Sequence, residues 1–285
     1  MFLNFVEHVI PPEVINFRAF GPFYDLVLSK FGYDPILDAK ARDLLDGFIS
    51  TDPREVLTRM ARTCAGKTPL VFGAAPSLEK DGRAALEGLG DRTLGERFVT
   101  CAADGAARLF LELDKRVDLA FTDLDGLTGP QLENLRSRGT ILVVHAHGDN
   151  VSLIREREKL IREGSASNQL LGTTQAPPTK KVINPGGFTD GDRAVCFVHH
   201  FLPRARYYLF GMDFGGEVGR YSKPGLASSS KPSETKRTKL DLGLGILEWL
   251  VKVRGVEAVA VGVGPPSEVV RTIATEEFLS SVAGR

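Results

Sequence analysis

The sequence predicts an α/β fold with a mainly parallel sheet, and three observations support this prediction. From residue 69 onward, short apolar runs alternate with longer amphipathic windows, which is the pattern of βαβ units. Several apolar runs end in loops that carry Asp and Gly, and ligands bind at the carboxyl ends of parallel strands. The 285 residues, 42% of them apolar and 25% charged, can form an ample globular core.

The first 66 residues differ from the rest of the chain. They are rich in aromatic side chains, and the window 36–49 spaces its apolar residues three or four positions apart, as an amphipathic helix does. Thr51-Asp52 followed by Pro53 is typical of a helix start, so a helix is expected over 53–65. We therefore expect an N-terminal helical region, residues 1–66, and an α/β catalytic domain, residues 67–285.

The second domain is expected to be a Rossmann-like sheet flanked by helices. Its expected strands are short and apolar: 69–73, 97–101, 117–121, 140–145, 169–174, 206–211 and 257–262. The windows between them predict helices over 77–88, 104–115, 129–138, 149–163, 190–201, 235–254 and 267–283. Residues 215–234 interrupt this rhythm with Gly, Ser, Pro and Lys. That composition predicts a mobile loop that orders when ligands bind.

Charge and cysteine content exclude several classes of protein. The 36 acidic residues balance the 36 basic ones, whereas a general nucleic-acid binder usually carries a basic excess. Cys64, Cys101 and Cys196 are odd in number and widely spaced, as expected for reduced core residues. No apolar run reaches the roughly 18 residues of a membrane span, and no secretory signal is recognisable. We expect a soluble cytoplasmic protein with no nucleic-acid or membrane partner.

The most informative stretch is FTDLDG, residues 121–126. Asp123 and Asp125 follow an apolar strand, and residues two apart on an extended backbone point the same way. Asp104 follows the preceding strand and Asp149 the next one. Carboxylates that meet at one sheet edge can hold a hard divalent cation that carries phosphates. Taken alone, each loop is equally typical of an ordinary turn.

The loop GAAPSL, residues 73–78, follows the first strand of the sheet and leads into a helix start. Free N–H groups at such a start can face a phosphate, which makes Gly73, Ala74, Pro76 and Ser77 candidates for nucleotide binding. The loop is neither the dinucleotide fingerprint nor a Walker loop. A plain turn remains the alternative.

Loops later in the sequence add further polar residues that are candidates for substrate contact. Asp190, Asp192 and Arg193 stand at a helix start, where they either cap the helix or contact substrate. Asp213 lies just past another strand.

Three cations, Lys236, Arg237 and Lys239, begin the last long helix. Their charges oppose the helix dipole unless an anion is near. A phosphate-binding role and a solvated helix face both remain open.

Together these motifs resemble the archaeal 6-hydroxymethyl-7,8-dihydropterin pyrophosphokinase (MptE-like) family, which is similar to the catalytic domain of thiamin pyrophosphokinases. The resemblance covers about residues 68–262 and rests on GAAPSL (73–78), ADGAA (103–107), VDLAFTDLDG (117–126), VHAHGDN (144–150) and GFTDGDRA (187–194). Ala75 departs from the glycine that related sequences often carry.

The resemblance implies transfer of diphosphate from ATP to the hydroxymethyl group of a reduced pterin, with release of AMP. It also implies Mg²⁺ held by Asp123, Asp125 and Asp149. Lys236, Arg237 or Lys239 could then stabilise negative charge in the transition state, with Lys239 as the catalytic candidate. Nucleotide contacts would come from the first loop and from Asp104, Gly105 and Asn150. The pterin contacts would come from among Asp190, Asp192, Arg193 and Asp213, and the sequence does not choose between them.

Three other functions remain open at this point. They are thiamin pyrophosphokinase, a metal-dependent nucleotide-sugar glycosyltransferase and a non-catalytic nucleotide-binding protein. The sequence also leaves open whether the product feeds tetrahydromethanopterin or folate biosynthesis, how many Mg²⁺ ions bind, and whether the N-terminal region packs internally or forms a homodimer contact.

Overall fold

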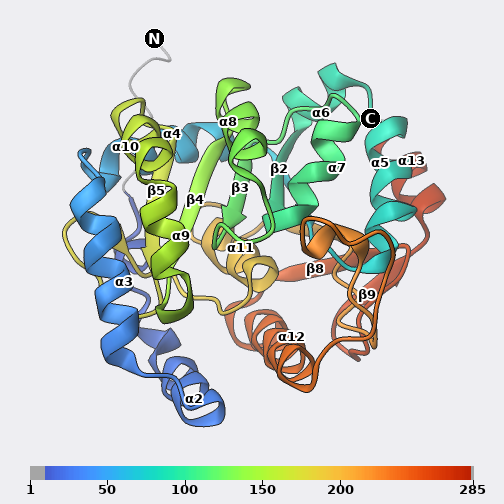
Figure 1. Ribbon diagram of the computed structural model, residues 1–285. Helices are drawn as coiled ribbons and strands as arrows, with labels where there is room; N and C mark the ends of the chain where they lie inside the picture. Colours follow the sequence, from blue (N-terminus) through green and yellow to red (C-terminus); the bar gives the residue numbers. More distant parts are fainter. Residues whose placement is uncertain (1–9, 284–285) are drawn as a thin grey trace.

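A computed structural model describes residues 10–283 of the chain. At its centre is one nine-stranded sheet in the order β6-β5-β4-β3-β2-β1-β7-β8-β9 (Figure 1). Every neighbouring pair of strands is parallel. The strands are β1 (Thr68–Phe72), β2 (Phe98–Ala103), β3 (Leu119–Thr122), β4 (Ile141–Ala146), β5 (Leu170–Thr174), β6 (Val182–Ile183), β7 (Arg206–Phe210), β8 (Glu257–Val261) and β9 (Arg271–Ile273).

Helices cover both faces of this sheet (Figure 1). The α-helices are α1 (Pro12–Ile15), α2 (Gly21–Phe31), α3 (Pro35–Phe48), α4 (Pro53–Cys64), α5 (Asp81–Gly88), α6 (Asp91–Arg97), α7 (Ala107–Glu112), α8 (Gly129–Ser137), α9 (Val151–Glu156), α10 (Glu158–Ala166), α11 (Asp190–His199), α12 (Glu234–Arg254) and α13 (Thr275–Ala283). Short 3₁₀ turns are η1 (Arg18–Phe20), η2 (Pro76–Glu79), η3 (Asp104–Ala106), η4 (Gly148–Asn150) and η5 (Arg220–Ser222).

The predicted α/β class and all seven expected strands are confirmed. The expectation of one helix over 267–283 is wrong, because β9 occupies Arg271–Ile273 and α13 begins only at Thr275. The β-branched Thr272 and Ile273 pair with β8 as an edge strand, and such side chains suit a strand better than a helix. The other strand that was not expected, β6, is only two residues long.

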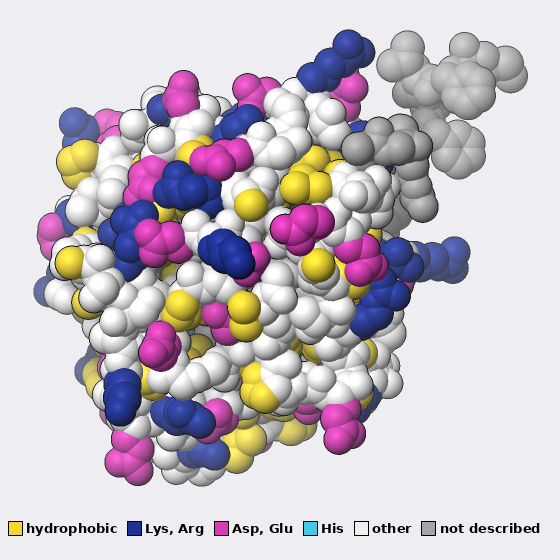
Figure 2. Space-filling view, turned by 90° about the vertical axis from the view of Figure 1, so that its right-hand side faces the viewer, with side chains coloured by type: hydrophobic (Ala, Val, Ile, Leu, Met, Phe, Trp, Pro, Cys, Tyr) yellow, Lys and Arg dark blue, Asp and Glu magenta, His cyan; other side chains and the backbone are white. Residues whose placement is uncertain are grey.

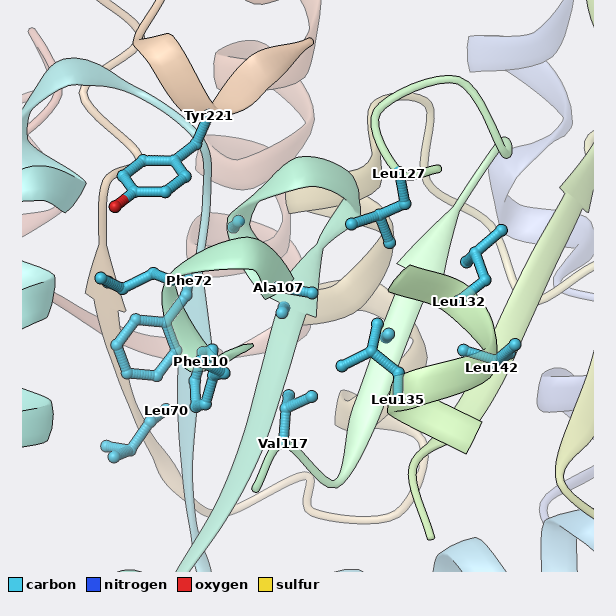
Figure 3. Close-up of a cluster of buried hydrophobic side chains, with 14 of the residues drawn as sticks. Leu70, Phe72, Ala107, Phe110, Val117, Leu127, Leu132, Leu135, Leu142 and Tyr221 are labelled. Carbon is cyan, nitrogen blue, oxygen red and sulfur yellow. The ribbon is translucent and has the colours of Figure 1, made fainter. Parts of the chain in front are cut away.

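The strands send alternate side chains into two apolar layers. Leu70 and Phe72 of β1 belong to the layer under α5, α7, α8 and α13, part of which Figure 3 shows. Val71 belongs to the opposite layer under α4, α11 and α12. A strand buried on both faces reads as a continuous apolar run, which explains why these strands were visible in the sequence. Cys64, Cys101 and Cys196 are buried and unpaired, as expected.

The N-terminal helices contribute to both layers. Asp34 and Asp52 cap α3 and α4 by accepting the amide N–H groups of Ile36 and Arg54, each at 2.8 Å, and the predicted start of α4 at Pro53 is confirmed. Helix α3 packs into the first layer and α4 into the second. Residues 1–9 of the expected N-terminal region lie outside the described residues, and the domain boundary at residue 66 remains a prediction.

The segment 215–233, which we call the strap, contains an apolar anchor that its composition did not suggest. Tyr221 is fully buried in the first apolar layer (Figure 3). Its hydroxyl donates to the Glu112 carboxylate at 2.5 Å. Backbone hydrogen bonds join Val218 and Ser230 in both directions, at 2.8 and 3.0 Å. These contacts give the segment a fixed point in the core, and its ordering by ligands remains a prediction.

The strand order places a topological switch point between β1 and β7. From β1 the chain adds strands in one direction to β6, then returns to the other side of β1 with β7. In open α/β sheets, ligands bind beside such a point at the carboxyl ends of the strands. The fold thus indicates where its functional site should lie.

The outer surface mixes charges of both signs. Figure 2 shows the side that carries α5 and α13, where basic and acidic side chains are interspersed over the described residues. Among residues 10–283, no helix combines the length and the apolar character that a membrane span requires.

Phe72→Ala should lower the free energy of unfolding by about 3–5 kcal/mol. Phe72 is fully buried, its ring stacks on that of Phe210 at 4.8 Å between centroids, and it meets Phe110 edge-on. Urea unfolding of this variant beside Val253→Ala, which alters a side chain that is 64% exposed, measures the difference. If both substitutions lower the free energy of unfolding by a similar small amount, the expected contribution of this aromatic cluster to stability is contradicted.

Candidate active site

A cavity of about 270 Å³ lies at the carboxyl ends of the central strands. Loops after β1, β2, β3 and β7 line it, together with the first turns of α11 and α12 and part of the strap. The cavity therefore lies at the switch point between β1 and β7. Its walls come from segments far apart in the sequence, which the parallel sheet brings together.

Three carboxylates converge in this cavity. Asp104, Asp123 and Asp125 each offer one oxygen, and these oxygens lie within 4.8 Å of one another. Thr122, the last residue of β3, links two of the loops: its hydroxyl donates to Asp104 at 2.7 Å and accepts the Leu124 N–H at 2.8 Å. We call Asp104, Asp123 and Asp125 the acidic trio.

The backbone around the acidic trio is in an unusual conformation. Asp104 has φ +46° and Leu124 has φ +75°, a left-handed region that costs a non-glycine residue about 1–3 kcal/mol when the surroundings enforce it. Gly126 is required beside them, because a Cβ there would collide with the Asp104 carboxylate. The fold thus holds these acids close together against local preference.

Burial and mutual repulsion shift the pKa values of the acidic trio. Burial, then the negative charges of Asp123 and Asp190, raise the pKa of Asp104 well above its usual range. Burial and Asp123 likewise raise the pKa of Asp125. Burial acts to raise the pKa of Asp123 too, but the His147 hydrogen bond and charge outweigh it and the pKa is lowered. An all-oxygen set of clustered carboxylates fits a hard cation such as Mg²⁺.

The HGDN turn supports Asp123 from the next strand. The Asn150 side-chain amide donates to the backbone oxygens of Asp123 at 2.9 Å and His145 at 2.7 Å. The His147 Nδ1 accepts the Asp149 N–H at 3.3 Å, which leaves Nε2 to donate toward Asp123 at 3.4 Å. Asn150 therefore holds the backbone of the loop that carries Asp123, and it does not line the cavity.

Asp149 does not join the acidic trio, contrary to the sequence-based expectation. Its side chain is 62% exposed, and its carboxylate lies 4.0 Å from the His147 Nδ1. The 3₁₀ turn η4 directs this residue outward while its backbone N–H binds His147. Asp104, expected to contact the nucleotide, instead supplies the third carboxylate.

A residue that sequence reasoning missed, Asp38 of α3, holds the same turn from the N-terminal region. Its buried carboxylate accepts the Gly148 N–H at 2.7 Å, the Tyr24 hydroxyl at 3.0 Å and the Gln175 side-chain amide at 3.0 Å. The helix window 36–49 was visible in the sequence, but nothing local marked Asp38 as a contact across 110 residues.

The first loop forms the floor of the cavity. Gly73 continues the β1–β7 ladder, since its N–H donates to the Phe210 oxygen at 2.8 Å. Gly73 and Gly211 approach so closely that a Cβ on either would collide with the carbonyl of the other. Ala74 lines the cavity, whereas Pro76 and Ser77 do not.

Asp213 and Ser77 bridge the gap between β7 and β1. The Ser77 N–H donates to the Asp213 carboxylate at 3.1 Å, and the Ser77 hydroxyl donates to its other oxygen. Asp213 also lines the cavity, but both of its oxygens are already engaged. Its position fixes the first loop against β7.

The candidates at the start of α11 separate into two kinds. Asp192 accepts the N–H groups of Phe188 and Thr189 at 2.6 and 2.8 Å, and the nearly buried Arg193 donates to the carbonyls of Gly187 and Phe188. Neither residue lines the cavity. Of the two roles considered for them, capping the helix and contacting substrate, the structure supports capping.

Asp190 is different, because it lines the cavity with spare acceptor capacity. Among the described residues its carboxylate receives no hydrogen bond, and its nearest cation, the Arg193 Nε, is 3.9 Å away. Burial and the charge of Asp123 raise its pKa to about 8. Such a group favours a ligand that donates hydrogen bonds to it.

Cations line the cavity as well. Lys236 and Lys239 of α12 face the cavity, and the Lys239 ammonium also lies 5.4 Å from the centre of the Tyr33 ring. Lys223 of the strap pairs with Asp125. Lys223 was not singled out in the sequence, because it lies within a segment interpreted as a mobile loop.

Comparison with known proteins identifies related sequences. Residues 49–219 match the model of a family described as 6-hydroxymethylpterin diphosphokinase MptE-like. A protein of Pyrococcus furiosus named 6-hydroxymethyl-7,8-dihydropterin pyrophosphokinase is 37% identical over 83% of this chain and 94% of its own length. A protein of the same name from Methanothermobacter thermautotrophicus is 37% identical over 80% of this chain and 92% of its own length.

A third protein of that name, from Methanocaldococcus jannaschii, is 31% identical over 83% of this chain and 96% of its own length. Among solved structures, a MAf glycosyltransferase from Magnetospirillum magneticum AMB-1 aligns with 83% of this chain at a TM-score of 0.44 and 16% identity. This chain spans only 42% of that protein, and so slight a likeness carries no conclusion about activity.

Asp104→Asn, Asp123→Asn and Asp125→Asn should each weaken Mg²⁺ binding by about 10-fold or more while the fold persists, because each removes a charge from the acidic trio. Asp123→Asn and Asp125→Asn should also abolish most activity. Asp149→Asn is the matched control and should bind Mg²⁺ almost as the unmodified protein does. Isothermal titration with Mg²⁺ measures the four affinities, and a larger loss for Asp149→Asn than for Asp104→Asn would overturn the assignment.

Proposed function

The chain belongs to the MptE-like family of 6-hydroxymethylpterin diphosphokinases, and on that premise we propose that it transfers diphosphate from ATP to 6-hydroxymethyl-7,8-dihydropterin in a Mg²⁺-dependent reaction. As a member of this family it is an enzyme, a pterin pyrophosphokinase. The observation that carries the finer proposal is the acidic trio inside a cavity at the switch point of the sheet.

The proposed reaction joins the pterin hydroxymethyl oxygen to the β-phosphorus of ATP. The bond between that phosphorus and the α–β bridging oxygen breaks, and AMP leaves. Phosphoryl transfer depends on positioning and on charge neutralisation more than on covalent help from the protein. Asp104, Asp123 and Asp125 would hold Mg²⁺, which when bound neutralises charge on the phosphate oxygens.

The remaining residues position the two substrates. The backbone of Gly73 and Ala74 forms a floor without bulky side chains, on which phosphates can approach the chain closely. Lys236 and Lys239 place positive charge in the cavity, where developing negative charge on the phosphates would be stabilised. This arrangement supports the nucleotide occupying the side of the cavity next to the acidic trio.

Asp190 is the proposed acceptor for the pterin. A pterin presents a ring N–H and an exocyclic amino group on one edge, and a carboxylate can accept both. Among the described residues, no group donates a hydrogen bond to Asp190, which is one of the acids expected to contact substrate and lines the cavity. Met212 and Phe214 line the same cavity and offer apolar surface to a flat ring.

The product is proposed to enter tetrahydromethanopterin or folate biosynthesis in the cytoplasm. The homodimer contact of the N-terminal region remains a prediction.

Nucleotide analysis tests the site of attack. With ATP, Mg²⁺ and the reduced hydroxymethylpterin, we expect one AMP for each diphosphorylated pterin, because attack occurs at the β-phosphorus. The α,β-methylene analogue of ATP should inhibit without reacting. Thiamin serves as the control acceptor and should yield no AMP, whereas ADP with a monophosphorylated pterin would refute the proposal.

Asp190→Asn should raise the KM for the pterin by about 10- to 100-fold, because the new amide NH2 would face the pterin's own N–H groups and leave a hydrogen bond unmade, at a cost of about 1–3 kcal/mol. The KM for ATP should change little. Glu217→Gln is the matched control, because Glu217 lines the same cavity from the strap and is given no role with the pterin. Steady-state kinetics with each substrate varied in turn separates the two effects. A rise confined to the KM for ATP would place Asp190 on the nucleotide side instead.

A further inference from the structure

We propose that Lys223 is a phosphate-binding residue that pairs with Asp125 of the acidic trio in the free protein and transfers to the ATP phosphates when Mg²⁺ binds. This inference rests on the proposed function, because it takes the acidic trio as the Mg²⁺ site. It assigns a specific role to the strap, whose polar composition alone suggested only a mobile loop.

The backbone of Lys223 is held in place by its neighbours on the strap. Tyr221 is buried, and its hydroxyl binds Glu112 at 2.5 Å and receives a hydrogen bond from Arg220 at 2.6 Å. The Arg108 guanidinium donates to the carbonyls of Arg220 and Lys223, at 2.6 and 3.1 Å. The point from which the Lys223 side chain extends is therefore fixed at the cavity rim.

The Lys223 side chain has both a partner in the acidic trio and freedom to leave it. Its ammonium forms an ion pair with Asp125, and the side chain is 49% exposed. Lysine carries a compact charge on a flexible stem of four carbons. Because Lys223 lines the same cavity as the Gly73 loop, rotation about this stem can bring the ammonium to a phosphate without moving the backbone.

Charge balance makes this exchange favourable. One ammonium meets three carboxyl groups, and a single lysine cannot balance their charge once all three are ionised. A divalent cation neutralises the trio better than one lysine does, and it competes with Lys223 for Asp125. Once displaced, Lys223 stands beside the triphosphate, where lysine acts as a point-charge ligand.

A purely structural ion pair is the competing explanation. Half-exposed pairs of this kind contribute only about 0–1 kcal/mol, and the strap has its own anchor in Tyr221. Removing the Lys223 charge should therefore leave the fold intact. The two explanations differ in what they predict for metal binding, because only competition makes the loss of Lys223 strengthen it.

Lys223→Met and the control Lys231→Met, an exposed lysine of the same strap, provide the test. With Mn²⁺ alone, titrated by electron paramagnetic resonance, Lys223→Met should bind the metal up to about 5-fold more tightly, which corresponds to the upper range of an exposed ion pair. With Mg²⁺ and the α,β-methylene analogue of ATP, the same variant should bind the nucleotide at least about 10-fold more weakly. Lys231→Met should match the unmodified protein in both titrations.

Opposite changes in the two affinities support the proposal. Unchanged or weaker Mn²⁺ binding by Lys223→Met overturns it, as does an unchanged affinity for the nucleotide analogue or the absence of Mn²⁺ binding to every protein tested. Failure of the proposed function is seen separately, as ADP instead of AMP released by the unmodified enzyme. Neither titration requires turnover, so a failure of this inference can be distinguished from a failure of the proposed function.

Discussion

The mutual repulsion of three carboxylates within 4.8 Å is the constraint on which the rest of the site depends. Left-handed backbone at Asp104 and Leu124 brings the acids together, and Gly126 leaves room for them. His147 and Lys223 supply a hydrogen bond and a positive charge at the edge of the group. Each of these features is unfavourable or of little use alone. Together they support the proposed binding of a cation that carries phosphates.

The sequence predicted most of the fold and part of the site, for physical reasons. Strands buried on both faces are continuous apolar runs, and acids just after them must meet at one sheet edge, as Asp104, Asp123 and Asp125 do. Whether Asp149 joins them depends on the direction of a single 3₁₀ turn, which no periodic pattern records. The anchor of the strap is likewise one tyrosine in a polar segment, and β6 and β9 are too short for a periodic signal.

The N-terminal region gains a physical connection to the chemistry that its own residues do not reveal. Asp38 lies before the start of the family match at residue 49, yet it accepts the Gly148 N–H in the turn that carries His147. The Tyr24 hydroxyl and the Gln175 amide donate to the other oxygen of its carboxylate. The helices before the sheet thus stabilise the turn that donates to Asp123, and their contribution extends beyond the two apolar layers.

The close approach of Gly73 and Gly211 separates two parts of the cavity that differ in how freely their residues can be substituted. Neither position can accept a side chain without separating β1 from β7, so backbone atoms form the floor of the cavity and these two positions are closed to substitution. The walls from α11, α12 and the strap are built from side chains that point inward, and they can be exchanged one at a time. If the proposed reaction holds, a protein built on this sheet can acquire a new acceptor alcohol through changes in these walls while the backbone floor stays the same.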